Sequence, residues 1–249
     1  MIITKDNKMA DVIHLNYTTL TVLNRFGIEL GFGDKTIEDV CQTYQVDLDF
    51  FLEIINTFVN EDYFPKKHLQ SFSIKLINDY LKKTHDYYHQ FKVPEIEKLM
   101  EQMIDNCYTQ KSNLNLLKKF FNDYKQELIN HTKREDEVVF PYTLAIEKAF
   151  NTNKADKETM MLMEEYSIDV FESEHDNIEE KLFDLKNIII KYLPQPKNFE
   201  LCNKLLNELF TLEQDLNDHA RIEDKVLVPK VREMEKVIQK RFSEKQTNG

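Results

Sequence analysis

Apolar side chains recur every three to four residues over most of the chain, which is the spacing of one face of an α-helix. Beyond residue 70 this pattern predicts four long helices, at about 71–108, 112–149, 159–191 and 198–240. The segments Asn151–Asn153 and Pro194–Pro196 separate the later helices. Because four helices with short connections usually alternate in direction, we expect an up-down-up-down four-helix bundle over residues 71–240.

Three prolines, Pro94, Pro141 and Pro229, lie inside these helical patterns. A proline in a helix interior lacks the amide hydrogen, and its ring collides with the carbonyl one turn earlier. We therefore expect each of these prolines to kink or end its helix.

A smaller helical domain is predicted to precede the bundle, in residues 1–62. Apolar spacing predicts three helices there: one from Lys8 to about Arg25, one that Thr36 caps, and one that begins at Asp47. Residues 63–70 are interpreted as a linker, and residues 241–249 as a flexible tail.

The composition supports an all-α fold. The 249 residues include only 4 Gly and 6 Pro, which is few for the tight turns of a strand-rich protein. The net charge of −11 argues against binding to a phosphate backbone, where Lys and Arg must replace counterions. Segment 34–62 is rich in Asp and Glu, which opposes a DNA-binding role for the N-terminal helices. We expect no nucleic-acid partner.

Cysteine usage and the absence of apolar runs indicate the compartment. Cys41, Cys107 and Cys202 lie far apart and form no Cys-x-x-Cys pair, so they predict neither disulfides nor a zinc site. A reducing cytoplasm is the simplest environment for them. The N-terminus has no apolar signal segment, and no apolar run approaches the ~20 residues of a membrane span. We expect a soluble cytoplasmic protein that does not bind membranes.

The strongest signal in the sequence is an internal repeat. The pattern H-x-x-x-E-D-x-V-x-x-P occurs twice, beginning at His131 and at His219. One His-Asp pair precedes each copy, at His85 and at His175. The bundle is therefore interpreted as two helical hairpins, each of which contributes a lone histidine and then an H-x-x-x-E motif.

The spacing of the repeat predicts a metal site. Residues four apart lie on one helix face about one turn apart, and the inward residues of an antiparallel bundle meet at one level. Imidazoles and carboxylates together suit a pair of iron ions. The candidate ligands are His85, His131, His175 and His219 as terminal ligands, with Glu135 and Glu223 as bridges. Positions left free on the metals suit an oxo bridge, oxygen or nitric oxide, so we expect an oxo-bridged di-iron centre.

Other interpretations of these residues stay open. A single His or Glu on an amphipathic helix is usually a surface or satisfied core residue, but a buried cluster is costly unless a metal compensates it. His89, four residues after His85, is a fifth terminal ligand, a group that supports a ligand, or a surface residue. A ferritin-like site needs two Glu-x-x-His motifs, and only Glu172–His175 matches. Zinc is a further candidate, although it usually takes four ligands.

The motifs resemble those of a known family. The two H-x-x-x-E motifs with the two earlier histidines resemble the hemerythrin-like domain. The resemblance extends over nearly the whole chain to the di-iron proteins of iron–sulfur cluster repair (the RIC family), through the segments Arg25–Glu29, Lys35–Cys41, Glu172–Asp176, Val138–Pro141 and Val226–Pro229. That family usually carries Cys-Cys-Gly-Gly where this chain has Gly31–Asp34, so the thiol pair is missing here.

The resemblance implies a non-haem di-iron protein that repairs iron–sulfur clusters damaged by oxidative or nitrosative stress, with iron–sulfur proteins as partners. One alternative is a module that binds or senses oxygen or nitric oxide without repair, which the missing cysteines favour. Another is a helical scaffold without metal. No nucleophile motif or Gly-rich phosphate loop is present, so a classical enzyme is not expected. The apolar faces that carry Phe50, Phe51 and Phe58 suggest a homodimer.

Overall fold

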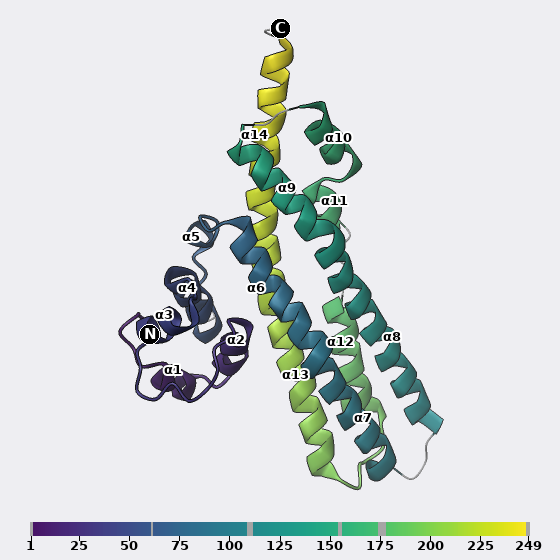
Figure 1. Ribbon diagram of the computed structural model, residues 1–249. Helices are drawn as coiled ribbons and strands as arrows, with labels where there is room; N and C mark the ends of the chain where they lie inside the picture. Colours follow the sequence, from purple (N-terminus) through teal and green to yellow (C-terminus); the bar gives the residue numbers. More distant parts are fainter. Residues whose placement is uncertain (1, 61, 109–111, 154–155, 174–177, 248–249) are drawn as a thin grey trace. The chain divides into compact units, whose positions relative to one another are not determined.

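The structure is a computed structural model that describes residues 2–60, 62–108, 112–153, 156–173 and 178–247 (Figure 1). These residues form helices and no strands, apart from an isolated antiparallel bridge between Lys8 and Thr36. The all-α fold class is therefore confirmed. The chain forms two compact units, the first from Met1–Thr84 with Lys225–Leu227 and the second from His85–Asp224 with Val228–Gly249.

The described part of residues 1–62, where we expected three helices, contains four: α1 (Met9–Leu15), α2 (Thr19–Arg25), α3 (Ile37–Tyr44) and α4 (Leu48–Val59). The first unit also includes α5 (Lys66–Leu69), which lies in the expected linker, and the first part of α6 (Ile74–Tyr87). The prediction of one helix from Lys8 to Arg25 is wrong. Asn16 is extended, and its side-chain oxygen accepts hydrogen bonds from the Thr18 amide at 3.0 Å and hydroxyl at 2.7 Å. Such a local bond competes with the helix and ends α1.

The predicted helix starts are confirmed at two positions. The Thr36 hydroxyl oxygen accepts a hydrogen bond from the Asp39 amide at 3.2 Å, and the Asp39 carboxylate accepts one from the Thr36 amide at 3.3 Å. This reciprocal capping box starts α3. The Asp47 carboxylate accepts a hydrogen bond from the Phe50 amide at 2.9 Å and caps α4.

Aromatic side chains form much of the core of the first unit. Phe50 and Phe51 are fully buried, and the Phe26 ring centroid lies 5.1 Å from that of Phe51 and 5.4 Å from that of Tyr80. Phe50 and Phe51 therefore pack inside their own unit and do not supply an exposed dimer face. The homodimer therefore stays a prediction without this support. The predicted domain boundary at residue 62 also stays a prediction, and the first compact unit extends beyond it to Thr84.

The second unit contains the remaining helices. Its α-helices are α7 (Val93–Cys107), α8 (Ser112–Arg134), α9 (Phe140–Asn151), α10 (Lys157–Glu165), α11 (Ile168–Ser173), α12 (Ile178–Asn187), α13 (Phe199–Ile222) and α14 (Val228–Thr247). Its π-helical segments are η1 (Tyr88–Lys92), η2 (Glu135–Val139), η3 (Ile188–Tyr192) and η4 (Glu223–Leu227), the last of which extends into the first unit. Helices α7 and α12 each pack against both α8 and α13, so these four close a bundle (Figure 1). The predicted four-helix bundle is confirmed.

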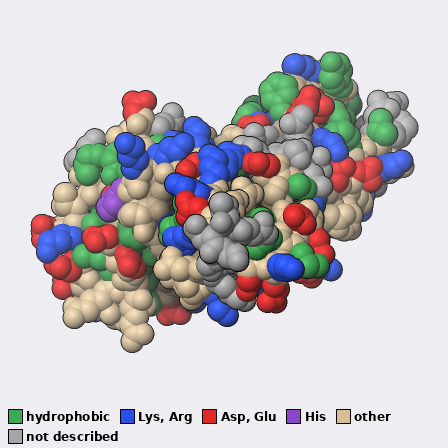
Figure 2. All heavy atoms as spheres, turned by 90° about the horizontal axis from the view of Figure 1, so that it is seen from above, with side chains coloured by type: hydrophobic (Ala, Val, Ile, Leu, Met, Phe, Trp, Pro, Cys, Tyr) green, Lys and Arg blue, Asp and Glu red, His purple; other side chains and the backbone are tan. Residues whose placement is uncertain are grey.

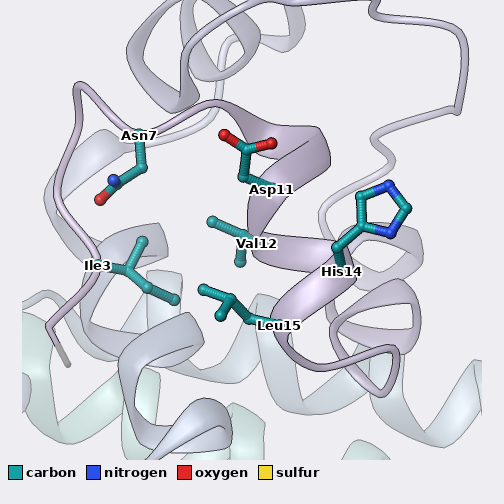
Figure 3. Close-up of a pocket in the computed structure, with 6 residues that line it drawn as sticks. All are labelled: Ile3, Asn7, Asp11, Val12, His14 and Leu15. Atoms are coloured by element: carbon teal, nitrogen blue, oxygen red, sulfur yellow. The ribbon is translucent and has the colours of Figure 1, made fainter.

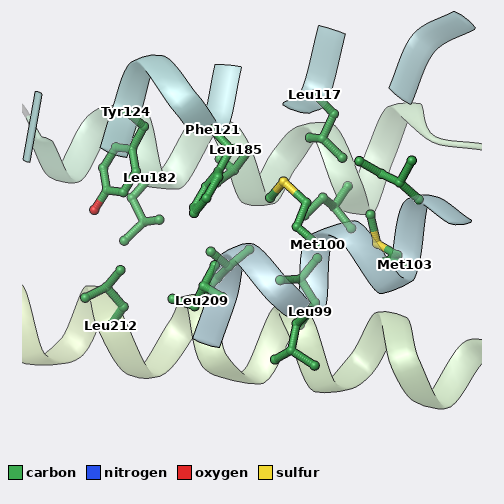
Figure 4. Packing of buried hydrophobic residues seen from close by; sticks show 14 of the residues in the cluster. Leu99, Met100, Met103, Leu117, Phe121, Tyr124, Leu182, Leu185, Leu209 and Leu212 are labelled. Atoms are coloured by element: carbon green, nitrogen blue, oxygen red, sulfur yellow. The ribbon is translucent and has the colours of Figure 1, made fainter. Parts of the chain in front are cut away.

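The core of the bundle is made of side chains from all four helices (Figure 4). Fully buried examples include Leu117 of α8, Leu182 of α12 and Leu209 of α13, which meet Met100 of α7. Burying a side chain of this size contributes roughly 1.5–3 kcal/mol, so the apolar stripes that predicted the helices also hold them together.

Two helix boundaries differ from the prediction. The third bundle helix, expected to run unbroken over 159–191, is interrupted where α10 ends at Glu165 and α11 begins at Ile168. Tyr166 is extended there, and the Ile168 amide donates a hydrogen bond of 3.0 Å to the buried carboxylate of Glu235. At the other end of the chain, α14 continues to Thr247. Residues expected to begin a flexible tail at 241 are therefore helical.

The prolines inside the helical patterns coincide with π-helical turns. Each π segment ends two residues before a proline, and these prolines are Pro94, Pro141, Pro194 and Pro229. At Pro94, Pro141 and Pro229 the helix continues instead of ending. In η2, for example, the Phe140 amide donates to the carbonyl of Glu135, five residues back. The wider turn keeps the proline ring away from the preceding carbonyl.

Candidate metal centre

Four of the predicted ligands converge in the second unit. His85 comes from α6 and His219 from α13, while Glu135 and Glu223 are the first residues of η2 and η4. One ligand atom from each of the four lies within 4.8 Å of the others. None of the four residues is more than 6% exposed.

The distances inside this cluster follow from the helix spacing. His219 Nε2 lies 3.0 Å from Glu223 Oε1, as expected for residues four apart on one helix. His85 Nε2 lies 3.1 Å from His219 Nε2 and 3.3 Å from Glu135 Oε2. Imidazole nitrogens and carboxylate oxygens from both halves of the repeat therefore meet at one point.

The chemistry of this donor set fits a metal cation. Two carboxylates with almost no exposure are costly to bury unless a positive charge compensates them. Burial lowers the pKa of His85 to about 4, against the opposing effect of its hydrogen bond to Asp136. His85 is therefore neutral at pH 7, and the neutral imidazole is the form that binds metals. Among the described residues, Nδ1 of His219 has no hydrogen-bond partner.

The remaining predicted ligands lie at the edge of this cluster or outside the described residues. His131 Nε2 lies 3.0 Å from Glu135 Oε1, and the His131 side chain is 18% exposed. His89 Nε2 is instead 2.8 Å from the Thr132 hydroxyl, which favours a supporting role over that of a fifth terminal ligand. His175 lies outside the residues that the structure describes. The roles of all three as ligands stay predictions.

Three residues that the sequence reasoning did not assign contact the cluster. Asp136 Oδ1 lies 3.0 Å from His85 Nδ1, and the Phe140 ring stacks on the His85 ring at 5.6 Å between centroids. The Tyr88 ring lies edge-on to the His219 ring at 6.0 Å. One signal was available in the sequence, because an Asp follows the Glu in both copies of the repeat.

A pocket in the first unit lacks such convergence. It has a volume of about 370 Å³ and is lined by Ile3, Asn7, Asp11, Val12, His14 and Leu15. Ile3, Val12 and Leu15 face one another there, while the Asp11 carboxylate and the His14 ring point away from them (Figure 3). The polar groups share no common point, so this pocket is not a second candidate centre.

On the face shown in Figure 2, Lys and Arg side chains of the described residues lie among Asp and Glu side chains. None of the helices in the described part of the chain combines the length and the apolar character needed to cross a lipid bilayer.

Two comparisons show which known proteins this chain resembles. Residues 77–231 match the family model of the hemerythrin HHE cation-binding domain, and this range includes every predicted ligand. The iron-sulfur cluster repair proteins YtfE of Salmonella newport (strain SL254) and Salmonella agona (strain SL483) are each 22% identical to it over 199 residues. The aligned region covers 80% of this chain and 83% of each relative.

Proposed function

Because the chain belongs to the family of hemerythrin HHE cation-binding domains, we propose that it is a non-haem iron protein with two iron ions that repairs damaged iron–sulfur clusters. The convergence of His85, Glu135, His219 and Glu223 carries this proposal. Its test is the iron content of the full chain and the response of that content to substitution of single ligands.

The proposed ligand set extends this cluster. Two ions need more donors than four side chains supply, and His131 and His175 complete three donors from each half of the repeat. Glu135 and Glu223 would each hold the ions through two carboxylate oxygens, and each starts the widened turn of its helix. The histidines act as terminal ligands through single ring nitrogens.

The protein's own residues prepare the site for the metals. The buried side chains exclude water, and the lowered pKa of His85 leaves its nitrogen without a competing proton at pH 7. When bound, the iron ions supply redox chemistry and affinity for oxygen and nitric oxide. The repair role itself follows from the likeness to proteins named for iron–sulfur cluster repair, and the partner is then an iron–sulfur protein damaged by oxidative or nitrosative stress.

Iron content is the first experiment. Protein purified without chelator is expected to hold about two irons per chain, with near-ultraviolet charge-transfer absorption. Glu135→Ala and His219→Ala should lose most of both signals, because each removes a donor of the cluster. His14→Ala is the matched control, since it removes a histidine from the first unit. Folded wild-type protein without iron after anaerobic ferrous loading would rule out the proposal.

A second candidate function is the binding or sensing of oxygen or nitric oxide without repair. Gly31–Asp34 stand where the resembling family carries a cysteine pair, which removes thiol chemistry at that position. The iron-loaded protein should reactivate an iron–sulfur dehydratase inactivated by nitric oxide if repair is its function. Reversible gas binding, seen as a spectral change, with no reactivation would select the second function.

A further inference from the structure

Asp136 makes a contact that the proposed ligand set does not use. Its Oδ1 lies 3.0 Å from His85 Nδ1, the ring nitrogen on the side away from His219. We propose that Asp136 is a positioning residue that holds the His85 imidazole in one tautomer and one orientation, with Nε2 available to a metal. The metal-binding part of this inference rests on the proposed function.

The tautomer follows from the chemistry of the two groups. An ionised carboxylate only accepts hydrogen bonds, so the proton between Asp136 and His85 belongs to Nδ1. A neutral imidazole carries one N–H, and Nε2 is therefore the unprotonated nitrogen whose lone pair can bind a metal. That nitrogen is the one that lies 3.3 Å from Glu135 Oε2 and 3.1 Å from His219 Nε2.

The orientation is held on three sides by one short segment. Asp136 contacts Nδ1, Glu135 lies beside Nε2, and the Phe140 ring stacks on the imidazole face with an angle of 8° between the planes. Glu135 and Asp136 open η2, and Phe140 is the first residue of α9. The η2 turn thus supplies a candidate ligand and also supports the ring of a candidate ligand from another helix.

Exposure suits Asp136 to this role. Its side chain is 21% exposed, whereas that of His85 is 1% exposed. Water can therefore solvate part of the carboxylate, which reduces the cost of keeping a charge beside a buried ring. Carboxylates that accept from the far nitrogen of a metal-binding histidine commonly raise metal affinity.

The tautomer can be tested on metal-free full-length protein by long-range ¹⁵N–¹H NMR of the histidine rings. Wild type and Asp86→Ala should show His85 protonated at Nδ1. Asp86 is the matched control, because it is the neighbouring carboxylate in sequence and is exposed. Asp136→Ala should shift His85 to a mixture of tautomers or to the Nε2 form. An unchanged His85 spectrum in this variant would overturn the inference, whatever the metal content of the protein.

Metal affinity provides the second readout, measured by competition for ferrous iron with a chelator. Asp136→Ala should lower the affinity about 10–100-fold. Asp136→Asn keeps an oxygen that accepts a hydrogen bond, and it should recover part of the lost iron affinity. It is also the variant to use if Asp136→Ala does not fold. Asp86→Ala should match wild type. If Asp136→Ala binds iron as tightly as wild type, the positioning role is overturned and the proposed centre is left intact. If the wild-type protein itself does not bind ferrous iron, the result counts against the centre.

Discussion

At the scale of single residues, the buried carboxylate of Glu235 makes the stability of the second unit depend on pH. Glu235 of α14 is 5% exposed, and its Oε1 accepts hydrogen bonds from the Tyr142 hydroxyl and the Ile168 amide. Burial raises the pKa of Glu235 above its usual value, and these two hydrogen bonds partly oppose the rise. Between its unfolded and folded pKa values, the folded state holds more protons, so this residue makes stability fall as pH rises.

Glu235→Gln should remove this cost. The amide oxygen can still accept both hydrogen bonds, but it carries no charge. We expect the metal-free variant to have a higher free energy of unfolding than wild type at pH 7. The difference should shrink as the pH falls through the raised pKa of Glu235, where the wild-type carboxyl becomes protonated. Urea unfolding at pH 7 and at a series of lower pH values measures this. Glu233→Gln, at an exposed position of the same helix, should show no such pattern. A variant less stable than wild type at pH 7 would contradict the assignment.

Local spacing predicted the residue contacts within one helix but not those between helices. His131–Glu135 and His219–Glu223 are both at 3.0 Å, as four-residue spacing requires. The contact of Asp136 with His85 joins residues 51 positions apart, and spacing along one helix does not predict it. His89 likewise contacts the hydroxyl of Thr132, which belongs to another helix.

At the scale of helices, apolar periodicity predicted the existence of the bundle helices better than their continuity. Periodicity records which face is buried, and that face continues across η1, η2 and η4. At the break after Glu165, the Ile168 amide donates a hydrogen bond to the Glu235 carboxylate, which is distant in sequence and so not visible in local spacing. The prolines inside the helical patterns were expected to kink or end their helices, and at Pro94, Pro141 and Pro229 a π turn lets the helix continue.

Pro141→Ala tests whether the proline maintains the η2 turn. Alanine can donate an α-helical hydrogen bond, so the turn should relax and move Glu135 and Asp136. Iron affinity should fall about tenfold or more, while the metal-free melting temperature should not fall, since Ala is ~3 kcal/mol more favourable than Pro in a helix interior. Chelator competition and thermal unfolding measure the two effects.

Pro194→Ala is the matched control for this substitution. Pro194 follows η3 at the same spacing, but η3 begins at Ile188 and not at a candidate ligand. Its iron affinity should equal that of wild type. Equal affinity in Pro141→Ala as well would show that the π turn persists without its proline.

At the scale of the whole molecule, each compact unit has its own buried core. Phe51 and Ile55 belong to the core of the first unit, and Leu185 and Leu209 to that of the second. The candidate centre uses residues of the second unit alone. A ligand that binds only the folded state stabilises the folded unit that holds it. The stabilisation is ~2.7 kcal/mol when the free ligand concentration is 100 times the dissociation constant.

Iron loading should therefore protect the two units unequally. Hydrogen exchange followed by mass spectrometry should show amides of α8 and α13 slowed by up to ~100-fold on loading, while those of α3 and α4 keep their rates. Glu223→Ala should abolish the difference between loaded and metal-free protein. Equal protection of both units would mean that they unfold as one cooperative body.

The π turns also bear on how this chain tolerates changes in length. A π turn holds one residue more than an α-helix of the same span, so losing a residue between Glu135 and Val139 could leave an unbroken helix. Everything beyond it would then keep nearly its present orientation, but Pro141 would stand in a regular helix, where its ring collides with the carbonyl one turn earlier. The number of residues between each glutamate and its proline is thus under constraint in addition to their identities, and single-residue deletions in η2 should destabilise the second unit through the clash of Pro141 with the preceding turn.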